Sequence, residues 1–145
     1  MIDISEIPEL RNDYYTHIEW NGRVYPSLEN AFQASKFYNP DMQKRFTTMA
    51  AAQAAAIGNI RKPPVKDWYK NEAKILYELL MVKFQDEKLK KILLDTNDKY
   101  LVYHNKYHDN VLGICTCKRC YNHAPFHNLL GKELMIVRDE LREVQ

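Results

Sequence analysis

The chain has 145 residues, which suffices for one domain with a single sizeable hydrophobic core. Its 21 Lys and Arg against 19 Asp and Glu leave a formal charge of +2, which excludes a strongly polybasic protein and permits only a local basic patch. The N-terminus lacks the basic and apolar segments of a secretory signal, and no run approaches the roughly 18 apolar residues of a membrane span. Three cysteines within six positions do not indicate a disulfide framework. We therefore expect a reducing, cytoplasmic location and no membrane partner.

The N-terminal half of the chain is predicted to form a hairpin followed by helices. Asn21-Gly22 is the strongest short hairpin signal, because both positions of such a turn need a positive φ. Ser27 is a good N-cap for the next helix, and Gly58 ends an alanine-rich one. Pro63-Pro64 is a break, because successive prolines cannot continue a helix. The predicted elements are strands 18–20 and 23–25 and helices 27–38, 40–46, 49–57 and 65–84, the last being the longest.

The C-terminal half is predicted to contain two helices, a short strand and a long loop that holds four histidines and three cysteines. The predicted elements are helix 86–96, strand 100–103, the loop-rich segment 104–127, and a helix from 128 or 129 to 143. Together with the first half, they predict an α+β fold dominated by helices, with a small hairpin or short sheet. We expect one domain that spans residues 1–145.

Helix 27–38 is predicted to carry a concentrated polar stripe. Glu29, Gln33 and Lys36 fall within about 60° of one another on a helix, and Phe32 and Phe37 flank them. Such a stripe is usually a solvated surface, whereas an acid, an amide and an amine between two aromatic rings also suit the wall of a ligand cleft. Periodicity alone does not say which face meets a ligand, so both interpretations stay open.

The polar stripe belongs to a set of short motifs that run in order through nearly the whole chain. The motifs are Tyr25-Pro-Ser-x-Glu29-x-x-x-Gln33-x-x-Lys36-Phe37, Gly58 with Arg61, Trp68, Lys83-Phe84, Leu93-Leu-x-Thr96, Asp109-x-x-x-Gly113 and Asn128-Leu-Leu-Gly131-Lys-Glu-Leu-Met-x-Val-Arg138. This set resembles the NADAR family, also called YbiA-like, whose name refers to NAD and ADP-ribose. Three positions depart from the family pattern: Leu112 replaces a common tryptophan, Tyr103 lies near a position that is often acidic, and the N-terminal Ser-Asn-Phe element keeps only Asn12. The resemblance implies a YbiA-like fold.

The resemblance also implies an enzyme that hydrolyses N-glycosidic bonds between a ribose anomeric carbon and a nitrogen. Cleavage of such a bond builds positive charge on the sugar while an amine leaves, and a carboxylate can stabilise that charge or move protons. A neutral lysine amine can form a Schiff base with an opened ribose aldehyde. We therefore predict Lys36 as the nucleophile and Glu29 as its proton-transfer or ribose-hydroxyl partner. Asp109 is predicted as a second acid or a ribose binder, with a turn aspartate as the alternative.

Further residues are predicted to bind the substrate. They are Asn12, Gln33, Arg61, Trp68, Asn128 and Gly131. Gln33 is expected to orient the substrate, and Arg61 to contact phosphate. Trp68 suits base stacking, although a core position is the more frequent role of a tryptophan early in a helix. Asn128 is expected mainly to cap the last helix, whose N-terminus also suits phosphate.

The loop-rich segment contains a set of soft metal donors. Cys115, Cys117 and Cys120, with His123 or His127, suit a structural zinc site with three thiolates and one imidazole. Free thiols are the alternative, because Cys-x-Cys is tighter than the usual Cys-x₂-Cys spacing. The implied reaction needs no metal, so we expect no required cofactor. We expect His104 and His108, in the same segment, to be surface or hydrogen-bonded structural histidines.

Three functions compete. The first is a hydrolase that removes ADP-ribose from guanine in DNA or RNA, which would antagonise an ADP-ribosylating toxin. The second is an N-glycosidase of phosphoribosylamino intermediates of riboflavin synthesis, and the third is a non-catalytic module that binds NAD or ADP-ribose. Retention of both Glu29 and Lys36 argues against the third. Charged and aromatic residues of segment 104–127 suit a nucleic-acid strand, and favour an ADP-ribosylated nucleic acid or nucleotide as the partner; they are Lys106, Tyr107, Lys118, Arg119 and Tyr121.

Overall fold

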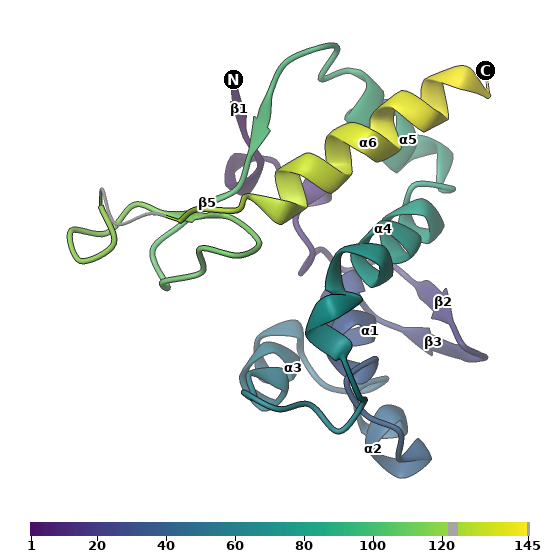
Figure 1. Cartoon of the computed structure of the whole chain (residues 1–145). Helices are drawn as coiled ribbons and strands as arrows, with labels where there is room; N and C mark the ends of the chain where they lie inside the picture. The colour runs from purple at the N-terminus through teal and green to yellow at the C-terminus, as the bar shows by residue number, and fades with distance from the viewer. Residues whose placement is uncertain (122–124, 145) are drawn as a thin grey trace. The chain divides into compact units, whose positions relative to one another are not determined.

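The computed structural model describes residues 1–121 and 125–144, which form two compact units. Unit 1 comprises Met1–Arg11 and Asp86–Gln145, and unit 2 comprises Asn12–Gln85. Helices and three short two-stranded sheets make up the described residues, so the predicted helix-dominated α+β class is confirmed. Figure 1 shows the elements, and each unit is described in turn below.

Unit 2 begins with the predicted hairpin. Strand β2 (Ile18–Trp20) pairs antiparallel with β3 (Arg23–Tyr25), and Ile18 lies opposite Tyr25. The two turn residues have φ values of 50° and 78°, as the Asn21-Gly22 signal requires. The hairpin prediction is therefore confirmed in strand bounds, register and turn.

Helix α1 (Leu28–Ala34) begins where predicted but ends four residues early. Ser27 Oγ accepts from the N–H of Asn30 at 3.1 Å, which confirms the predicted N-cap. At the other end, Ser35 Oγ donates to the carbonyl of Phe32 at 2.5 Å, and the N–H of Lys36 turns back to Gln33 at 3.1 Å. Serine hydroxyls that bond to nearby carbonyls compete with helical bonding, so the last turn tightens and the helix stops.

Both sides of α1 are covered, because α3 (Ala51–Gly58) and α4 (Glu72–Lys83) pack against it (Figure 1). Helix α2 (Pro40–Arg45) follows α1 in the chain and precedes α3, and Asn39 caps it as predicted. The side-chain amide of Asn30 donates to the carbonyls of Phe46 at 2.9 Å and Met49 at 2.8 Å. A buried amide thus ties the start of α1 to the segment that leads into α3.

The prediction of one long helix over residues 65–84 is wrong at its start. Asp67 has a left-handed backbone with φ of 58°, and a 3-10 turn, η3 (Trp68–Lys70), precedes α4. The side chain of Asn71 donates to the carbonyl of Asp67 at 3.1 Å and closes this turn. Trp68 therefore lies in a tight turn before the helix. The longest helix is α6 (Leu129–Glu143) in unit 1.

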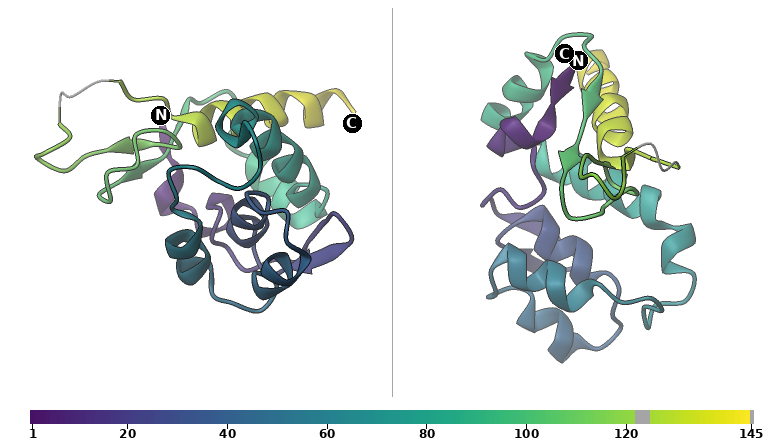
Figure 2. Two further views of the ribbon diagram at one scale, coloured as in Figure 1. Left: turned by 60° about the horizontal axis from the view of Figure 1, so that its bottom comes forward. Right: turned by 90° about the vertical axis from the view of Figure 1, so that its left-hand side faces the viewer.

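In unit 1, a strand at the N-terminus of the chain pairs with a strand from the second half of the chain. Strand β1 (Ile2–Asp3) lies parallel to β4 (Leu101–Val102), and the 3-10 turns η1 (Ile4–Glu6) and η2 (Pro8–Leu10) follow β1. Helix α5 (Glu87–Leu94) is capped by Asp86, and α6 packs on both α5 and β4 (Figure 1, Figure 2). Strand β4 and both helices confirm the predictions with shorter ends. The sequence pattern did not predict β1 and its turns, because two-residue strands have no periodicity.

A third parallel pair lies in the segment predicted as loop-rich. Strand β5 (His104–Asn105) pairs with β6 (Ile114–Cys115), with Asn105 opposite Cys115. The buried side chains of unit 1 that form its core are Ile4, Leu10, Leu89, Leu93, Leu101, Val102, Leu130, Leu134, Val137 and Leu141. Among the buried polar groups, Arg138 donates to Thr96 Oγ1 at 3.0 Å and to the carbonyl of Lys99 at 2.8 Å.

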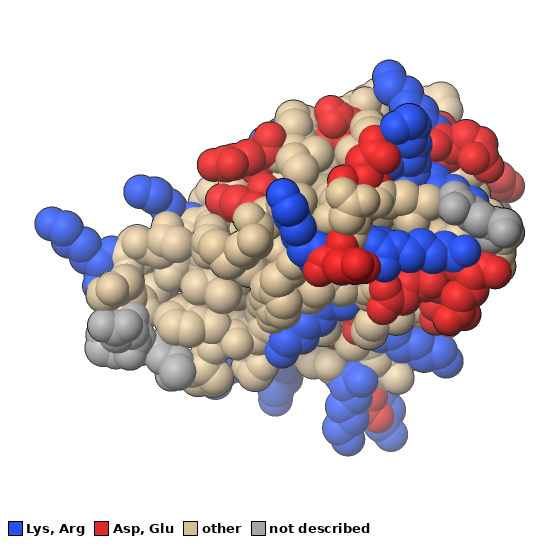
Figure 3. All heavy atoms as spheres, turned by 90° about the horizontal axis from the view of Figure 1, so that it is seen from above, with Lys and Arg blue, Asp and Glu red and all other residues tan. Residues whose placement is uncertain are grey.

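The charged residues lie mostly mixed on the surface. On the face that Figure 3 shows, Lys and Arg side chains lie among Asp and Glu over the right-hand part of the view, whereas the left-hand part is mostly uncharged. Among the described residues, helices are all too short or too polar to cross a membrane.

Candidate functional site

Lys36 lies in the turn after α1, and its side chain is buried, with 5% of the residue exposed. Its Nζ donates to the carbonyl of Gly58 at 2.7 Å. The same Nζ lies 4.6 Å from the ring centroid of Trp68, 5.9 Å from that of Phe32 and 5.8 Å from that of Tyr69. Burial disfavours the charged form of an amine, whereas aromatic faces and a carbonyl stabilise it. The amine is thus held in one place by packing.

The aromatic residues around Lys36 form a connected group. The ring of Trp68 meets that of Phe32 edge to face at 5.1 Å and that of Tyr69 at 5.1 Å. Trp68 Nε1 donates to Ser35 Oγ at 2.9 Å, and Tyr69 donates its hydroxyl proton to the carbonyl of Ile60 at 2.7 Å. Burial, with a smaller contribution from Glu72, raises the pKa of Tyr69 and keeps it a phenol.

Trp68 therefore fits the core alternative and also touches the predicted nucleophile. Trp68 is 1% exposed, so other residues of the protein cover its ring almost completely. Tyr69 is half exposed and was not singled out from the sequence, although it adjoins Trp68 in the chain. The aromatic pair at 68–69 was the signal that could have found it.

Gln33 links the two residues predicted to be catalytic. Its Nε2 donates to Glu29 Oε1 at 2.7 Å, and its Oε1 is buried without a hydrogen-bond partner in the described structure. Gly58, whose carbonyl accepts from Lys36, lies directly against this amide: a Cβ at position 58 would stand 1.9 Å from Gln33 Oε1. Only glycine permits that approach. Gln33 thus bonds to Glu29 and packs against Gly58, whose carbonyl accepts from Lys36.

Asn12 lies beside the same arrangement. Its carbonyl accepts from the N–H of Glu29 at 2.9 Å, and its side chain is buried, with Oδ1 unpaired in the described structure. A buried polar atom without a partner costs about 1–3 kcal/mol, and such atoms are rare in folded proteins. The amide oxygens of Asn12 and Gln33 are thus two buried acceptors without a partner in the described structure, on residues that each form a hydrogen bond with Glu29.

The solvated-surface interpretation of the polar stripe fails for Lys36 and Gln33, which are both buried, while Glu29 is partly exposed. Arg61, by contrast, is exposed in the segment between α3 and η3. The structure thus brings together Asn12, Glu29, Gln33, Lys36 and Trp68 in unit 2. Arg61 belongs to the same unit, and no hydrogen bond or ion pair with another described residue fixes its guanidinium.

The other predicted site residues belong to unit 1, where their contacts are structural. Asp109 Oδ1 accepts from the N–H groups of Val111 at 3.1 Å and Leu112 at 2.9 Å, which is the turn geometry considered as its alternative. Gly131 lies against β4, since a Cβ there would stand 2.2 Å from the carbonyl oxygen of Leu101.

Asn128 is the N-cap residue of the last helix, as predicted, but its backbone carbonyl accepts from the helix, at 3.0 Å from the N–H of Lys132, and its side chain does not. Its backbone is left-handed, with φ of 48°, and its side chain makes no capping bond to α6. Instead, Oδ1 accepts from the N–H of Tyr103 at 3.0 Å, and Nδ2 donates to the carbonyl of Leu101 at 2.9 Å. The amide therefore extends the edge of β4 and ties it to the start of α6.

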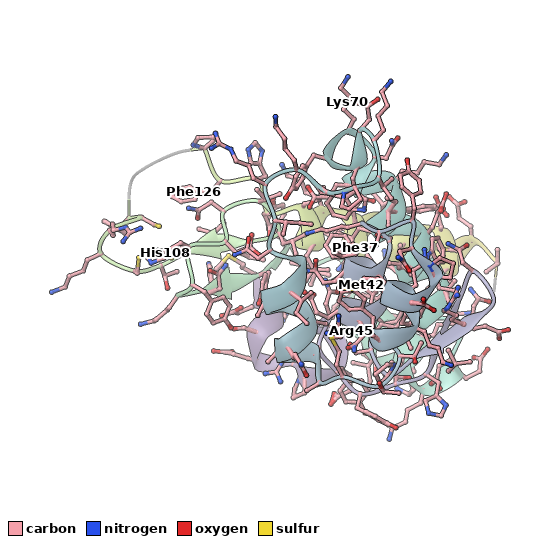
Figure 4. All side chains as sticks on the ribbon, turned by 90° about the horizontal axis from the view of Figure 1, so that it is seen from below. Phe37, Met42, Arg45, Lys70, His108 and Phe126 are labelled. Atoms are coloured by element: carbon pink, nitrogen blue, oxygen red, sulfur yellow. The ribbon has the colours of Figure 1, made fainter. Side chains whose placement is uncertain are left out.

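A second group of reactive side chains lies in unit 1. The ligand atoms of His108, Cys115, Cys117 and Cys120 all lie within 4.8 Å of one another, and this set is called the Cys–His cluster below (Figure 4). A hydrogen bond from the backbone N–H of Cys120 is the main cause that lowers the pKa of Cys117 to about 6.

The structure corrects the prediction of which histidine joins the three cysteines. His108 supplies the imidazole, whereas His127, which was predicted to do so, is outside the group of described ligands. His123, the other predicted ligand, lies outside the described residues. The expectation that His108 is a surface or hydrogen-bonded structural histidine agrees with its exposure and with its contacts to the three cysteines. What the spacing of the sequence did not predict is its place in the cluster, which follows from a turn around Asn105.

A hollow of about 290 Å³ lies elsewhere in unit 1, along α5. Its lining comes from one helix and its end: Glu87, Lys90, Lys91, Leu94 and Asp95. Such a shallow, charged surface offers neither the aromatic lining nor the convergent buried polar groups typical of a nucleotide site.

Comparison with known proteins identifies the family of the chain. The model of the NADAR domain matches residues 5–142, nearly the whole chain. The chain belongs to the NADAR domain family. Within the family it is similar to the N-glycosidase YbiA of Escherichia coli strain K12, with 29% identity over 127 residues that cover 86% of this chain and 75% of that protein.

The NADAR fold is also found in a solved structure. The NMR structure of E. coli YbiA superimposes with a TM-score of 0.79 at 27% identity, covering 94% of this chain and 79% of that one. The resemblance inferred from motifs is therefore confirmed at the level of family and fold.

Proposed function

We propose that this NADAR chain hydrolyses the bond between ribose C1 and a base nitrogen, and that its substrate is ADP-ribose attached to guanine in DNA or RNA. The observation that carries the proposal is the buried amine of Lys36, connected through Gly58 and Gln33 to the carboxylate of Glu29. The similarity to a protein named an N-glycosidase supports the reaction class.

Lys36 is proposed as the nucleophile. Its neutral amine attacks C1 of the ribose while the C1–N bond to guanine breaks and the departing nitrogen takes up a proton. The resulting ribosylamine opens to a Schiff base, and water then hydrolyses the imine to release ADP-ribose and regenerate the lysine. The aromatic rings around Nζ exclude water from the amine and limit its motion.

Glu29 is proposed to move the protons that this sequence of steps requires. It is partly exposed, so it can reach both a bound ribose and solvent, and the amide of Gln33 fixes one of its oxygens at 2.7 Å. The unpaired oxygens of Asn12 and Gln33 are proposed to accept hydrogen bonds from ribose hydroxyl groups. Arg61 is exposed and is proposed to contact a phosphate.

For Asp109, Asn128 and Gly131, the contacts described above favour a structural role over contact with substrate.

Nucleic acid is preferred as the carrier of the modified base because exposed cations and aromatic rings lie in one segment of the chain. Tyr107 and Tyr121 are 72% and 66% exposed, and Lys106, Lys118 and Arg119 are exposed beside them. At the left-hand end of the face in Figure 3, Lys and Arg side chains stand without Asp or Glu in view.

The test is incubation with ADP-ribosyl-guanine DNA, followed by measurement of free ADP-ribose. The wild type should release it, Lys36→Ala should not, and Lys70→Ala should match the wild type. Lys70 is a suitable control because it lies in the same unit with 81% of its side chain exposed (Figure 4). If the chain turns over only a phosphoribosylaminopyrimidine, its substrate is a small metabolite and not a nucleic acid. Binding of ADP-ribose without any turnover would make the chain a binding module.

The role of the lysine has its own test. Borohydride added during turnover should reduce the imine and leave a covalent sugar adduct on Lys36, located by peptide mass spectrometry. Turnover without any adduct would replace the Schiff base with direct attack of water assisted by Glu29.

A further inference from the structure

We propose that His108, Cys115, Cys117 and Cys120 bind one zinc ion that holds residues 103–121 in shape. The site is separate from the Lys36 arrangement and does not rest on the proposed function. It uses four side chains of unit 1 that the proposed reaction leaves without a role.

The distances within the Cys–His cluster match a tetrahedral metal centre. His108 Nδ1 lies 3.3 Å from Cys120 Sγ, 3.4 Å from Cys117 Sγ and 3.8 Å from Cys115 Sγ. A tetrahedral zinc with Zn–S of about 2.3 Å and Zn–N of about 2.0–2.1 Å separates sulfur from nitrogen by roughly 3.5 Å. The three observed separations scatter around that value, and all four ligand atoms lie within 4.8 Å of one another, so one ion is within reach of all four side chains.

Three independent backbone features bring these ligands together. Pairing of β5 with β6 places Cys115 opposite Asn105. A turn brings Cys120 back over Cys117, whose carbonyl accepts from the N–H of Cys120 at 3.2 Å and of Tyr121 at 2.9 Å. The resulting Cys117-x-x-Cys120 unit is the usual two-residue spacing of zinc knuckles. The tighter Cys115-x-Cys117 step is accommodated because Cys115 comes from a strand.

The third feature positions the histidine. Asn105 is 4% exposed, and its Oδ1 accepts from the N–H groups of Tyr107 at 3.2 Å and Asp109 at 3.1 Å. Its Nδ2 donates to the carbonyl of Asp109 at 2.8 Å. The turn so formed gives His108 a φ of 65°, an uncommon conformation for a residue other than glycine. A buried amide and a left-handed residue thus serve to present one imidazole to three thiols.

The donor set selects zinc over other common cations. Magnesium and calcium prefer oxygen ligands, whereas three sulfurs and one imidazole suit zinc. The cysteines are free, so no disulfide competes for the sulfurs. Four protein ligands complete a tetrahedron and leave no open position, which is the pattern of structural sites. Binding releases the thiol protons, and the net charge of −1 on the complex is opposed by Lys118 and Arg119 between two ligands.

A metal would supply what this segment lacks. Tyr107, Val111 and Tyr121 are exposed, and Cys115 is one of few fully buried side chains between residues 103 and 121. Segments with little buried apolar surface are ordered by metals or disulfides when hydrophobic burial is insufficient. The zinc site would therefore fix the loop that carries Lys106, Lys118 and Arg119.

The test is elemental analysis of the purified full chain together with variants. The wild type should carry about one zinc per chain, and Cys117→Ser and His108→Ala should lose at least about nine-tenths of it. His127→Ala is the matched control, since it removes a histidine of the same segment that is outside the cluster, and it should keep the metal. Zinc lost from His127→Ala but kept by His108→Ala would overturn the assignment of the fourth ligand.

A second measurement guards against variants that fail to fold. Cobalt(II) exchanged into the wild-type chain should give the intense visible absorption of a tetrahedral site and a near-ultraviolet band from thiolate coordination. A wild-type chain that carries no metal as purified, and that shows only the weak spectrum of six-coordinate cobalt, would overturn the proposal.

Discussion

The Lys36 site and the Cys–His cluster present reactive side chains by opposite means. Lys36 is fixed by a helix end and three aromatic rings in a densely packed part of unit 2. The cluster stands on turns of unit 1, where Cys117 and Cys120 are only partly buried and neighbouring rings are exposed. In the first region the core orders the chemistry, and in the second we infer that bound metal orders the chain. The two should therefore respond differently to the same perturbations.

The largest expected effect comes from Lys36→Met, which replaces the amine with an apolar side chain of similar length. Hydrolysis should fall by about 10³-fold or more, because the proposed nucleophile is gone. The free energy of unfolding should change by no more than about 1–2 kcal/mol. Loss of the hydrogen bond to Gly58 is offset because a buried amine no longer has to be accommodated. Initial rates and urea unfolding measure the two quantities.

An unfolded Lys36→Met protein would contradict this separation of stability from activity. Equal activity of Lys36→Met and wild type would remove the lysine from the reaction altogether. Lys70→Ala, measured in parallel, reports any general effect of removing a lysine from this unit.

Metal removal should distinguish the two regions next most clearly. A strong chelator should make the segment 104–121 sensitive to trypsin at Lys106, Lys118 or Arg119, because the cluster no longer orders it. Hydrolysis of a free ADP-ribosylated nucleoside should stay within about twofold, since the proposed reaction uses no metal. Mass spectrometry of the fragments and initial rates supply the measurements. Equal trypsin resistance with and without chelator would contradict a structural metal.

Two glycine substitutions compare the packing of the units. Gly58→Ala should lower the free energy of unfolding by about 1–3 kcal/mol and slow hydrolysis about tenfold, because the new methyl group displaces the Gln33 amide. Gly131→Ala should cost a similar or larger amount of stability, because the methyl group meets the backbone carbonyl of Leu101. Its rate per folded molecule should not change.

Thermal unfolding and rates per folded molecule test this pair. If folded Gly131→Ala loses hydrolysis as strongly as Gly58→Ala, Gly131 contacts the substrate, as its place in the family motif originally suggested.

The smallest effects are expected from Trp68→Phe and, below it, Tyr69→Phe. Trp68→Phe keeps an aromatic ring beside Lys36 but removes the hydrogen bond from Trp68 to Ser35. We expect a loss of about 1–2 kcal/mol in unfolding free energy and a decrease of only a few-fold in rate. Tyr69→Phe, which removes only the half-exposed hydroxyl bonded to Ile60, should change stability by less than about 1 kcal/mol. The reverse order in urea unfolding would contradict a packing role for Trp68.

Much of the fold could be predicted because its signals are local. Asn21-Gly22 sets a turn through positive φ, and Ser27, Asn39 and Asp86 begin helices with side-chain caps, as the structure confirms. The early end of α1 and the late start of α4 could not be predicted from periodicity. They depend on a serine hydroxyl bonded to a nearby carbonyl and on a left-handed aspartate, which leave apolar spacing unchanged.

The candidate sites divide in the same way. Spacing placed Glu29, Gln33 and Lys36 on one side of a helix, but it did not indicate that the Gly58 carbonyl and the Tyr69 ring meet the amine. Those contacts join segments more than 20 residues apart. In the cluster, the cysteines were evident from the sequence, whereas His108 was expected to be a surface or hydrogen-bonded structural histidine and not a ligand. Its direction depends on a turn closed by the buried amide of Asn105, which residue spacing does not indicate.

Helix α2 is held at both flanks but has no buried residue of its own. Before it, the carbonyl of Phe37 accepts from Gln43 at 2.7 Å, and after it Asn30 binds the carbonyl of Phe46 at 2.9 Å. Met42 and Arg45 face outward from this helix in Figure 4. Because hydrogen bonds fix the residues on both sides of α2, the helix itself can change in length or composition while Glu29, Gln33 and Lys36 keep their positions. Natural variation or an engineered insertion in α2 would therefore change the surface that the enzyme presents to other molecules and leave the reaction unchanged.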